Sequence, residues 1–532
     1  MLDTGSANAN DERIGMTLRN PIEEANEALA LADKGQVQMA ASRFEDLLQA
    51  HPEMAGARSN LGGLYTQIGQ STRAIEHLQR CLHDLPEFPE GWNNLGNALM
   101  QGCRMEEAFQ AFSRAIALRP DYFEAHSNRF IVLRYRQAPE KTEASAVTEW
   151  REALARFPIA SSPFRPLSSR NNSPPRIGFI SPDFRNHSIA FFLEPLLQHL
   201  DRNCFQIYLY SDVRKPDATT ARFRGLADYW RETTGQSHPM ALSAIREDAL
   251  DGLLDLTGHF QYNRLPLMAA RAALKQISWL GFPGPTATPS IDARISDSTV
   301  DPEDSPSRQQ ERIIRLPQGY HCYQPPANAP PVAEAPLTEN GFITFGSFNN
   351  AAKVSPAVAR LWGRILEATP RSRLLLKARA FEDSATRDHI RKGIIGKRPI
   401  DPKRITFLPR SPALTEHLKV YERLDLALDT FPYAGTTTTC EALWMGVPTL
   451  TLTGPSPPSR VGLSLLRQVN LETFATSSPE AYVQTACALA KKPAFLSRIR
   501  SVLRARMQKT PLMDQAAFTR AFENGLLETL GQ

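Results

Sequence analysis

Four consecutive threonines mark the stretch of this chain best suited to chemistry. Residues 424–428 before them have the length and apolar composition of a buried strand, and residues 440–446 after them follow a helical pattern. A second apolar segment, 448–452, completes a strand–helix–strand unit. Free N–H groups and hydroxyls at such a helix start favour phosphate binding, although a threonine-capped helix in any α/β domain explains the same residues. The four residues are Thr436, Thr437, Thr438 and Thr439.

Two charged side chains accompany this turn. Glu441 lies near the start of the helix, where its carboxylate could accept hydrogen bonds from a ribose. Lys353 lies in a loop between the predicted strand 341–348 and a helix that begins near residue 355. A lysine opposite a phosphate-binding helix terminus suits a diphosphate, because both neutralise its charge. The alternative interpretation of Lys353 is a solvated loop charge.

Two histidines occupy comparable positions. His187 follows the predicted strand 176–181 and precedes an apolar helix at 189–200. It therefore lies beyond the carboxyl end of a strand, where open α/β sheets bind their ligands. His417 lies at the start of a short helix near the edge that carries the threonines. Taken alone, His187 could simply cap its helix, and His417 could be a surface histidine.

These residues require two doubly wound α/β regions, predicted at 176–335 and 336–532. A cleft between two such regions is the usual place for a nucleotide-sized ligand. Further strands are predicted at 205–210, 252–256, 276–280, 312–316, 373–377 and 404–408.

The chain before residue 137 repeats itself every 34 residues. Ala40, Ala74 and Ala108 keep this interval, and so do three prolines. Small residues where two helices cross, with proline at the end of the second helix, resemble tetratricopeptide repeats, which must stack into a solenoid. The predicted divisions are a disordered segment at 1–20, repeats at 21–136, and a helix and linker at 137–175.

One asparagine recurs at the same position of each repeat. On stacked helices these amides would form a column that could grip the backbone of an extended peptide without reading its side chains. Hydrogen bonding between adjacent repeats is the alternative interpretation. The column consists of Asn26, Asn60, Asn94 and Asn128.

Composition narrows the class of protein. The formal net charge of +5 is small for 532 residues, and basic residues are mixed with acidic ones, which disfavours a nucleic-acid partner. Six dispersed cysteines with no close pair argue against zinc and against a disulfide framework. No apolar stretch is long enough to span a bilayer, and the polar N-terminus is unlike a signal peptide. We therefore expect a soluble cytoplasmic protein with neither metal nor other cofactor.

The same residues lie in motifs that resemble the O-linked N-acetylglucosamine transferase and SPINDLY family. Members of this family carry tetratricopeptide repeats ahead of a GT-B catalytic region. The resemblance implies an α + α/β fold, in which a repeat solenoid precedes two Rossmann-like domains. The motifs are SPDFRNHS (181–188), DLTGH (255–259), WLGFPG (279–284), FGSFNNAAK (345–353), the long segment 416–448 and SRVGLSLL (459–466).

The resemblance also implies roles for individual residues. The catalytic histidine of the family falls on His187, and the lysine that neutralises the leaving diphosphate falls on Lys353. The histidine that stacks on the base falls on His417, and the acidic ribose ligand falls on Glu441. The peptide-binding ladder of the animal enzymes falls on the asparagine column. Further donor contacts fall on Asn350, Thr437 and Thr438, and the lining of the sugar pocket on Leu280 and Pro283.

We expect an inverting, metal-independent protein O-glycosyltransferase that transfers N-acetylglucosamine from UDP-N-acetylglucosamine to Ser or Thr. The donor diphosphate would lie on Thr436–Thr439, and the repeats would present an extended protein acceptor. Animal members have histidine, aspartate and lysine at the positions of Thr436, Glu441 and Leu414. The turn is closer to SPINDLY, so protein O-fucosylation from GDP-fucose is an alternative. A non-catalytic scaffold that binds a nucleotide sugar, and transfer to a glycan or lipid, are the others.

Overall fold

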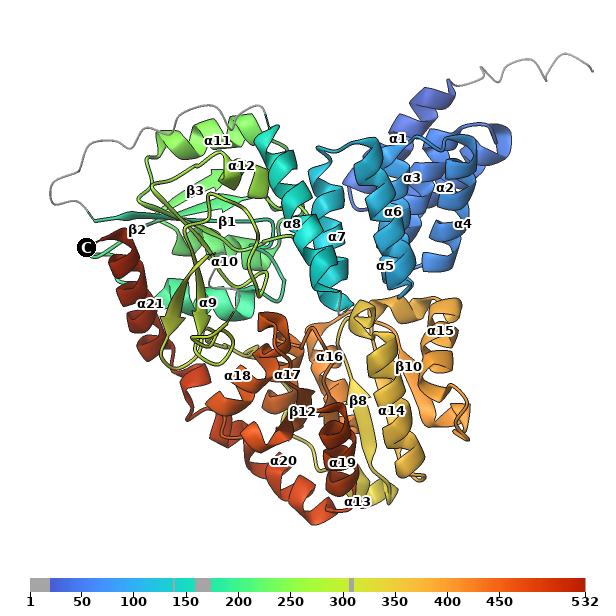
Figure 1. Ribbon diagram of the computed structural model, residues 1–532, viewed down its shortest axis with the longest axis vertical. Helices are drawn as coiled ribbons and strands as arrows, with labels where there is room; N and C mark the ends of the chain where they lie inside the picture. The colour runs from blue at the N-terminus through green and yellow to red at the C-terminus, as the bar shows by residue number, and fades with distance from the viewer. Residues whose placement is uncertain (1–19, 137–138, 158–173, 306–310, 532) are drawn as a thin grey trace, which may run out of the picture.

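The computed structural model describes residues 20–136, 139–157, 174–305 and 311–531. An array of helices packs against two units that are each built on a parallel sheet (Figure 1). This is the predicted architecture of a helical solenoid followed by two Rossmann-like domains. Apart from Asn20, the segment predicted to be disordered lies outside the described residues, and so does much of the predicted linker.

The solenoid is made of helix pairs whose first helices begin 34 residues apart, as predicted. Small residues allow the helices of a pair to approach closely. Ala40, Ala74 and Ala108 are completely buried, and a Cβ at Gly96 would lie 2.4 Å from the Phe112 ring. The helices are α1 (Pro21–Asp33), α2 (Val37–Ala50), α3 (Ala55–Ile68), α4 (Ser71–Asp84), α5 (Pro89–Gln101), α6 (Met105–Leu118), α7 (Phe123–Tyr135) and α8 (Glu140–Ala155).

Helix α8 belongs to the solenoid and also joins it to the first sheet. The sequence predicted this helix only as the start of a linker. Its Trp150 is buried against Phe130 of α7, and the indole Nε1 donates a hydrogen bond of 3.3 Å to Oγ1 of Thr288. The last repeat is therefore anchored on the unit that follows it.

The first lobe is the unit built on a seven-stranded sheet in the order β3-β2-β1-β4-β5-β6-β7, with all neighbours parallel. Its central strands are buried on both faces, which explains their continuous apolar sequences. The sequence predictions missed β3 and β6. The strands are β1 (Arg176–Ser181), β2 (Gln206–Ser211), β3 (Tyr229–Glu232), β4 (Gly252–Asp255), β5 (Lys275–Ser278), β6 (Ala293–Asp297) and β7 (Arg312–Leu316), and the helices α9 (Ala190–His199), α10 (Ala218–Leu226), α11 (His238–Glu247) and α12 (Leu265–Ala269).

The second lobe is built on a six-stranded parallel sheet in the order β10-β9-β8-β11-β12-β13. All of these strands were predicted from the sequence except the two-residue β13. The strands are β8 (Thr344–Ser347), β9 (Arg373–Lys377), β10 (Ile405–Leu408), β11 (Leu426–Leu428), β12 (Thr449–Leu452) and β13 (Ala475–Thr476). The helices are α13 (Leu337–Asn340), α14 (Pro356–Ala368), α15 (Ser384–Ile395), α16 (Leu414–Lys419), α17 (Thr437–Trp444), α18 (Val461–Gln468), α19 (Pro479–Ala490) and α20 (Pro493–Met507).

The last helix, α21 (Gln515–Leu530), returns to the first lobe. Figure 1 shows it in dark red beside the first sheet. Its Phe522 ring lies 4.9 Å from the Trp279 ring, and Glu528 forms an ion pair of 2.7 Å with Arg312 of β7. Although the sequence predicted 336–532 as one domain, this helix therefore packs with the first sheet.

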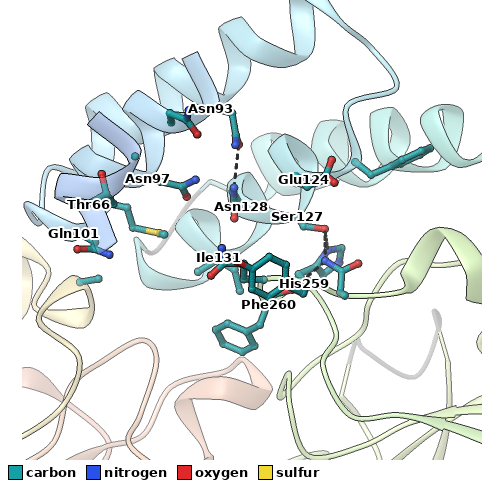
Figure 2. Close-up of a pocket in the computed structure, with 18 of the residues that line it drawn as sticks. Thr66, Asn93, Asn97, Gln101, Glu124, Ser127, Asn128, Ile131, His259 and Phe260 are labelled. Atoms are coloured by element: carbon teal, nitrogen blue, oxygen red, sulfur yellow. Dashed lines mark hydrogen bonds between the residues drawn. The ribbon is translucent and has the colours of Figure 1, made fainter. Parts of the chain in front are cut away.

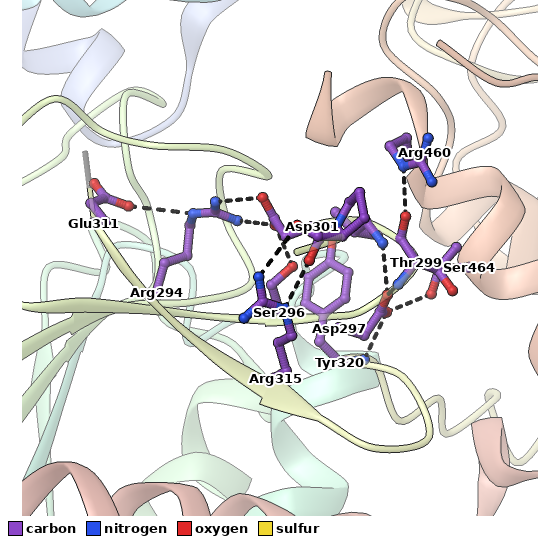
Figure 3. A network of polar contacts seen from close by, with 12 residues as sticks. Arg294, Ser296, Asp297, Thr299, Asp301, Glu311, Arg315, Tyr320, Arg460 and Ser464 are labelled. Carbon is purple, nitrogen blue, oxygen red and sulfur yellow. Dashed lines mark hydrogen bonds and ion pairs between the residues drawn. The ribbon is translucent and has the colours of Figure 1, made fainter. Parts of the chain in front are cut away.

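Hydrogen bonds join the two lobes at the end of β6 (Figure 3). The carboxylate of Asp297 accepts a hydrogen bond of 2.6 Å from the Ser464 hydroxyl of α18. Nε of Arg460 donates a hydrogen bond of 2.6 Å to the carbonyl of Thr299, and Arg467 donates to the hydroxyl of the same threonine. The SRVGLSLL motif thus positions the lobes relative to each other.

Candidate donor and acceptor sites

The turn before the threonines is held by a buried carboxylate. Asp429 is 1% exposed, and its Oδ1 accepts hydrogen bonds from the backbone N–H groups of Gly435 and Thr430 at 2.7 and 2.8 Å. Its Oδ2 accepts one of 2.7 Å from the Thr451 hydroxyl. Burial raises the pKa of Asp429, although these hydrogen bonds act against the shift. A Cβ at Gly435 would lie 2.4 Å from Oγ1 of Thr438, so this turn requires glycine.

The four threonines are not equivalent. Oγ1 of Thr439 is buried and donates to the Gly435 carbonyl at 3.1 Å, so this hydroxyl is engaged within the turn, and the predicted place of Thr439 in the donor site rests on its backbone N–H group. Oγ1 of Thr438 donates to Oδ1 of Asn349 at 2.9 Å. Thr436 and Thr437 are partly exposed, and their hydroxyls make no hydrogen bond within the described chain. These two, with the first N–H groups of α17, are the free donors of the turn.

Lys353 lies beside this turn, as the sequence predicted. It ends the short 3₁₀ helix η2 (Ala351–Lys353), in which the Asn350 side chain accepts a hydrogen bond of 3.1 Å from the N–H group of Ala352. Its Nζ donates a hydrogen bond of 3.1 Å to the Ala434 carbonyl and lies 4.3 Å from the centre of the Tyr433 ring. Burial lowers the pKa of Lys353 to about 8, while Asp429 acts in the opposite direction. The ammonium is therefore mostly charged at pH 7.

A chain of polar contacts continues along the same edge of the sheet. Nζ of Lys377, at the end of β9, lies 2.6 Å from Nδ1 of His417, and Nε2 of His417 lies 3.0 Å from Oε2 of Glu441. The Tyr421 hydroxyl donates to the same carboxylate oxygen at 3.2 Å. Burial lowers the pKa of Lys377 to about 8. The structure thus brings His417 and Glu441 together and adds two residues that the sequence analysis missed.

His187 lies on the first lobe, beyond the end of β1. Its side chain is 40% exposed, and its Nδ1 lies 3.6 Å from Oδ2 of Asp183 and 3.4 Å from the donating N–H of Ile189. Partial burial lowers the pKa of the imidazole. Asp183 opposes this shift, whereas Arg410, in the loop after β10 of the second lobe, adds to it. The neutral His187 therefore lies close enough to the second lobe for the charge of Arg410 to affect its pKa.

The predicted sugar-pocket residues lie in a loop that follows β5. Leu280 has a positive φ of 71°, and both Leu280 and Pro283 are partly exposed. The loop packs closely on the DLTGH motif, since a Cβ at Gly281 would lie 2.1 Å from the Leu256 carbonyl oxygen. Neither side chain lines the cavity described next, so their role as a sugar pocket stays a prediction.

A cavity of about 530 Å³ lies where the solenoid meets both lobes (Figure 2). It is lined by α3, α5 and α7, by the loops after β2 and β4, and by the segment that carries Asn350. Its lining is rich in primary amides, which can both donate and accept hydrogen bonds. Those from the repeats are Gln67, Asn93, Asn94, Asn97, Gln101 and Asn128.

The predicted asparagine column is only partly in this cavity. Asn94 and Asn128 line it, whereas Asn26 and Asn60 do not. Nδ2 of Asn94 donates to the Ser59 hydroxyl at 3.2 Å, and Nδ2 of Asn128 donates to Oδ1 of Asn93 at 3.0 Å. Both amides therefore also bond the preceding repeat, which was the alternative interpretation of the column. Figure 2 shows the Asn93–Asn128 contact at the top of the cavity.

His259, the histidine of the DLTGH motif, joins the solenoid to the first lobe. It is completely buried, with one ring nitrogen 2.8 Å from the Thr286 carbonyl and the other 3.2 Å from the Ser127 hydroxyl of α7. Its ring stacks on Phe130 at 4.3 Å. Burial lowers the pKa of His259 to about 3, so the group is neutral and structural.

Sequence comparisons decide the family. The profile of glycosyl transferase family 41 matches residues 156–324 and 335–522. The chain belongs to glycosyltransferase family 41. Tetratricopeptide-repeat profiles match residues 31–93 and 89–122, in agreement with the helix pairs.

Two plant proteins and one solved structure are similar over most of this chain. A tomato protein named as a probable UDP-N-acetylglucosamine–peptide N-acetylglucosaminyltransferase SPINDLY is 39% identical over 77% of the chain. Its Arabidopsis thaliana counterpart is 38% identical over 76%. The chain spans less than half the length of these two relatives, 44% and 45%. A mutant O-GlcNAc transferase from Thermobaculum terrenum matches with a TM-score of 0.89 and 31% identity, over 96% of this chain and 97% of its own.

The part of the chain that the structure describes contains no helix long and apolar enough to cross a membrane. Within the same residues, no three His, Cys, Asp or Glu side chains are grouped as metal ligands.

Proposed function

We propose that this chain is an inverting protein O-glycosyltransferase that transfers N-acetylglucosamine from UDP-N-acetylglucosamine to serine or threonine. The observation that carries the proposal is the position of Lys353, whose ammonium lies beside the free N–H groups and hydroxyls of the threonine turn. These groups together provide positive charge for a diphosphate. Membership of family 41 and the names of the plant relatives support the same reaction.

The reaction is a displacement at the anomeric carbon of the sugar. The acceptor hydroxyl attacks from the face opposite the diphosphate, so a new carbon–oxygen bond forms as the bond to the phosphate oxygen breaks. The diphosphate leaves with the electron pair, and the hydroxyl proton passes to a base. Lys353, Thr436 and Thr437 stabilise the charge that develops on the leaving group, which is commonly a large part of such catalysis.

His187 is proposed to orient the acceptor hydroxyl and to receive its proton. Its lowered pKa keeps the imidazole neutral at pH 7, as a proton acceptor must be. The Ile189 N–H group favours the tautomer in which Nδ1 accepts, whereas Asp183 favours the tautomer in which Nδ1 donates. The second tautomer leaves Nε2 free to accept the proton, so Asp183 is the partner that base catalysis needs.

The nucleoside is proposed to lie along the chain of contacts from Lys377 to Glu441. Both in-plane nitrogens of His417 are engaged by protein groups, which holds the ring plane for stacking on a base. The second carboxylate oxygen of Glu441 is left for the ribose hydroxyls. The proposed donor site is completed by Asn350, Thr438, Thr439, Leu280 and Pro283.

The amide-lined cavity is the proposed acceptor site. Amide side chains can bond to the N–H and C=O groups of an extended peptide whatever its sequence. The solenoid is then the surface that presents a protein acceptor. We also propose a cytoplasmic location, because the described cysteines are all free, as a reducing compartment requires.

A GDP-fucose donor is the second candidate, and one observation favours it. Thr436 and Glu441 depart from the animal N-acetylglucosaminyltransferases in the direction of SPINDLY. A thermal-shift comparison of UDP-N-acetylglucosamine with GDP-fucose separates the two donors, because only the bound donor stabilises the protein.

The test of the reaction is Lys353→Met, with sugar transfer or donor hydrolysis as the measurement. Loss of the ammonium should lower kcat by about 100-fold or more, as loss of one stabilising donor does elsewhere. Lys403→Met, an exposed lysine before β10, is the matched control. A Lys353→Met protein that turns over at the wild-type rate would overturn this mechanism. Binding of donor without turnover by the wild type would make the chain a scaffold.

A further inference from the structure

The proposed acceptor cavity carries two arginines that the mechanism does not use. Arg214 follows β2 on the first lobe and Arg379 follows β9 on the second, and both side chains line the cavity. Neither forms an ion pair with a carboxylate in the described parts of the chain. Asp212, two residues before Arg214, is held by Arg264 at 2.6 and 2.8 Å and is not available to it.

The remaining charges of the lining do not balance these two guanidinium groups. Glu124 is the acidic residue among the lining side chains. His238 and His259 are neutral at pH 7, because burial lowers the pKa of His238 to about 4 and that of His259 to about 3. Outside these groups the cavity presents amides, hydroxyls and apolar side chains, so its charge is positive overall.

The geometry of Arg214 leaves its hydrogen-bonding edge free. The guanidinium carbon lies 4.1 Å from the centre of the Tyr262 ring, so the planar group rests on the aromatic face. Stacking fixes the plane of a guanidinium while its N–H groups remain available to a carboxylate. Arg379 lies on the second lobe and also lines the cavity. Its backbone carbonyl and Cγ lie close to Gly69, in the turn between α3 and α4.

We propose that the acceptor segment carries acidic side chains, and that Arg214 and Arg379 bind them from the two lobes. This inference rests on the proposed function, because it concerns the acceptor of that reaction. Amides that grip a main chain give no sequence selectivity. The two arginines supply it, since bidentate arginine–carboxylate pairs depend on the side chain that is presented.

The test uses the full chain and labelled peptides of about 15 residues. Each peptide has one serine in an Ala/Gln background, and the flanking positions are Glu, Gln or Lys. By fluorescence anisotropy, the Glu peptide should bind about three- to tenfold more tightly than the Gln peptide at low salt, since two partly exposed ion pairs contribute modestly. The Lys peptide should bind weakest. The differences should shrink at about 0.5 M salt because screening weakens exposed pairs.

Two variants assign the effect to the arginines. Arg214→Gln and Arg379→Gln should each weaken binding of the Glu peptide about two- to fourfold and leave binding of the Gln peptide unchanged. Arg114→Gln is the matched control, because Arg114 is exposed on α6 and does not line the cavity.

Each other outcome overturns the inference. Equal binding of the Glu and Gln peptides removes the acidic preference and leaves the proposed transferase intact. Weaker donor binding by Arg214→Gln or Arg379→Gln would assign the arginines to the nucleotide sugar instead. Absence of binding by every peptide removes the cavity as the acceptor site. Sugar transfer to protein acceptors by the wild type tests the proposed function separately.

Discussion

Lys377 donates a hydrogen bond of 2.6 Å to Nδ1 of His417, and this contact determines which nitrogen of the imidazole carries the proton. Because Nδ1 accepts, a neutral His417 is protonated on Nε2 and donates to Oε2 of Glu441 at 3.0 Å. The Tyr421 hydroxyl donates to the same oxygen. Both hydrogen bonds are accepted by Oε2, which leaves Oε1 for the ribose hydroxyls of the proposed donor. Lys377 is thus a positioning residue for two groups of the proposed donor site.

Replacement of this lysine should weaken donor binding. Lys377→Met removes the donor to Nδ1, so His417 can adopt either tautomer and Glu441 loses a fixed partner. A hydrogen bond that involves a charged group contributes about 1.5–3 kcal/mol, so we expect the Kd of the donor to rise about tenfold or more. Isothermal titration calorimetry with the nucleotide sugar measures it.

The exposed Lys403→Met serves as the control for lost charge. An unchanged donor Kd in Lys377→Met would show that the polar chain is structural and that the nucleoside binds elsewhere. A rise in Kd with an unaltered unfolding temperature would assign the effect to the site rather than to the fold.

Donor binding should take up protons under alkaline conditions. The pKa of Lys353 is about 8 in the free protein, and a bound diphosphate must raise it because the anion favours the charged amine. At about pH 8.5 much of the free lysine is neutral, so binding should be coupled to proton uptake. At about pH 6.5 the lysine is already charged and should contribute nothing.

Calorimetry in buffers of different ionisation enthalpy measures this uptake. Lys353→Met should remove the share that belongs to Lys353, and Lys377→Met reports the share of the second lysine, whose pKa is also about 8. If wild type and Lys353→Met take up the same number of protons at both pH values, the ammonium does not contact the diphosphate.

Much of this fold could be predicted because its signals are local. The 34-residue interval of Ala40, Ala74 and Ala108 reports a contact that recurs in every repeat, and buried parallel strands are continuous apolar runs. β3 was missed because it lies at the sheet edge with exposed polar side chains, and its sequence YWRE lacks an apolar run. The return of α21 to the first sheet depends on contacts across more than 200 residues, for which the sequence contains no local signal.

The candidate site likewise has features that the sequence could predict and features that it could not. Lys353 and the threonine turn could be brought together from sequence, because both follow neighbouring strands of one parallel sheet. Lys377 also ends a predicted strand of that sheet, and its position was the signal that could have found it. The sequence could not predict that the Thr439 hydroxyl is bonded within the turn whereas the Thr437 hydroxyl is free. This difference depends on which hydroxyl the helix directs at the Gly435 carbonyl.

The amides of the third and fourth repeats should matter more than those of the first two. Asn128→Ala removes a cavity amide and leaves Oδ1 of Asn93 without its donor, so we expect the acceptor KM to rise about three- to tenfold, as loss of one hydrogen bond predicts. Asn26→Ala, outside the cavity, is the control and should change it little. Donor Kd should be unchanged in both. Equal effects of the two variants would favour a uniform ladder along the whole solenoid.

The joint between solenoid and first lobe should weaken in acid because His259 is buried and neutral. His259→Phe keeps a ring against Phe130 but leaves the Ser127 hydroxyl and the Thr286 carbonyl without this partner. At pH 7 we expect the variant to be less stable by about 1–3 kcal/mol, the cost of unsatisfied buried polar groups. Urea unfolding, followed by the fluorescence of the buried Trp150 among others, measures the difference.

The pH dependence distinguishes titration of His259 from a simple packing defect. The pKa of His259 is about 3 in the folded chain and near its ordinary value of about 6.5 when unfolded. Below about pH 6.5 the unfolded state therefore binds a proton that the folded state does not, so wild-type stability falls as the pH drops. Phenylalanine cannot titrate, so the gap between wild type and His259→Phe should narrow from pH 7 to pH 5. A gap that stays constant would mean that His259 binds its proton equally in the folded and unfolded states, contrary to its complete burial in the folded chain.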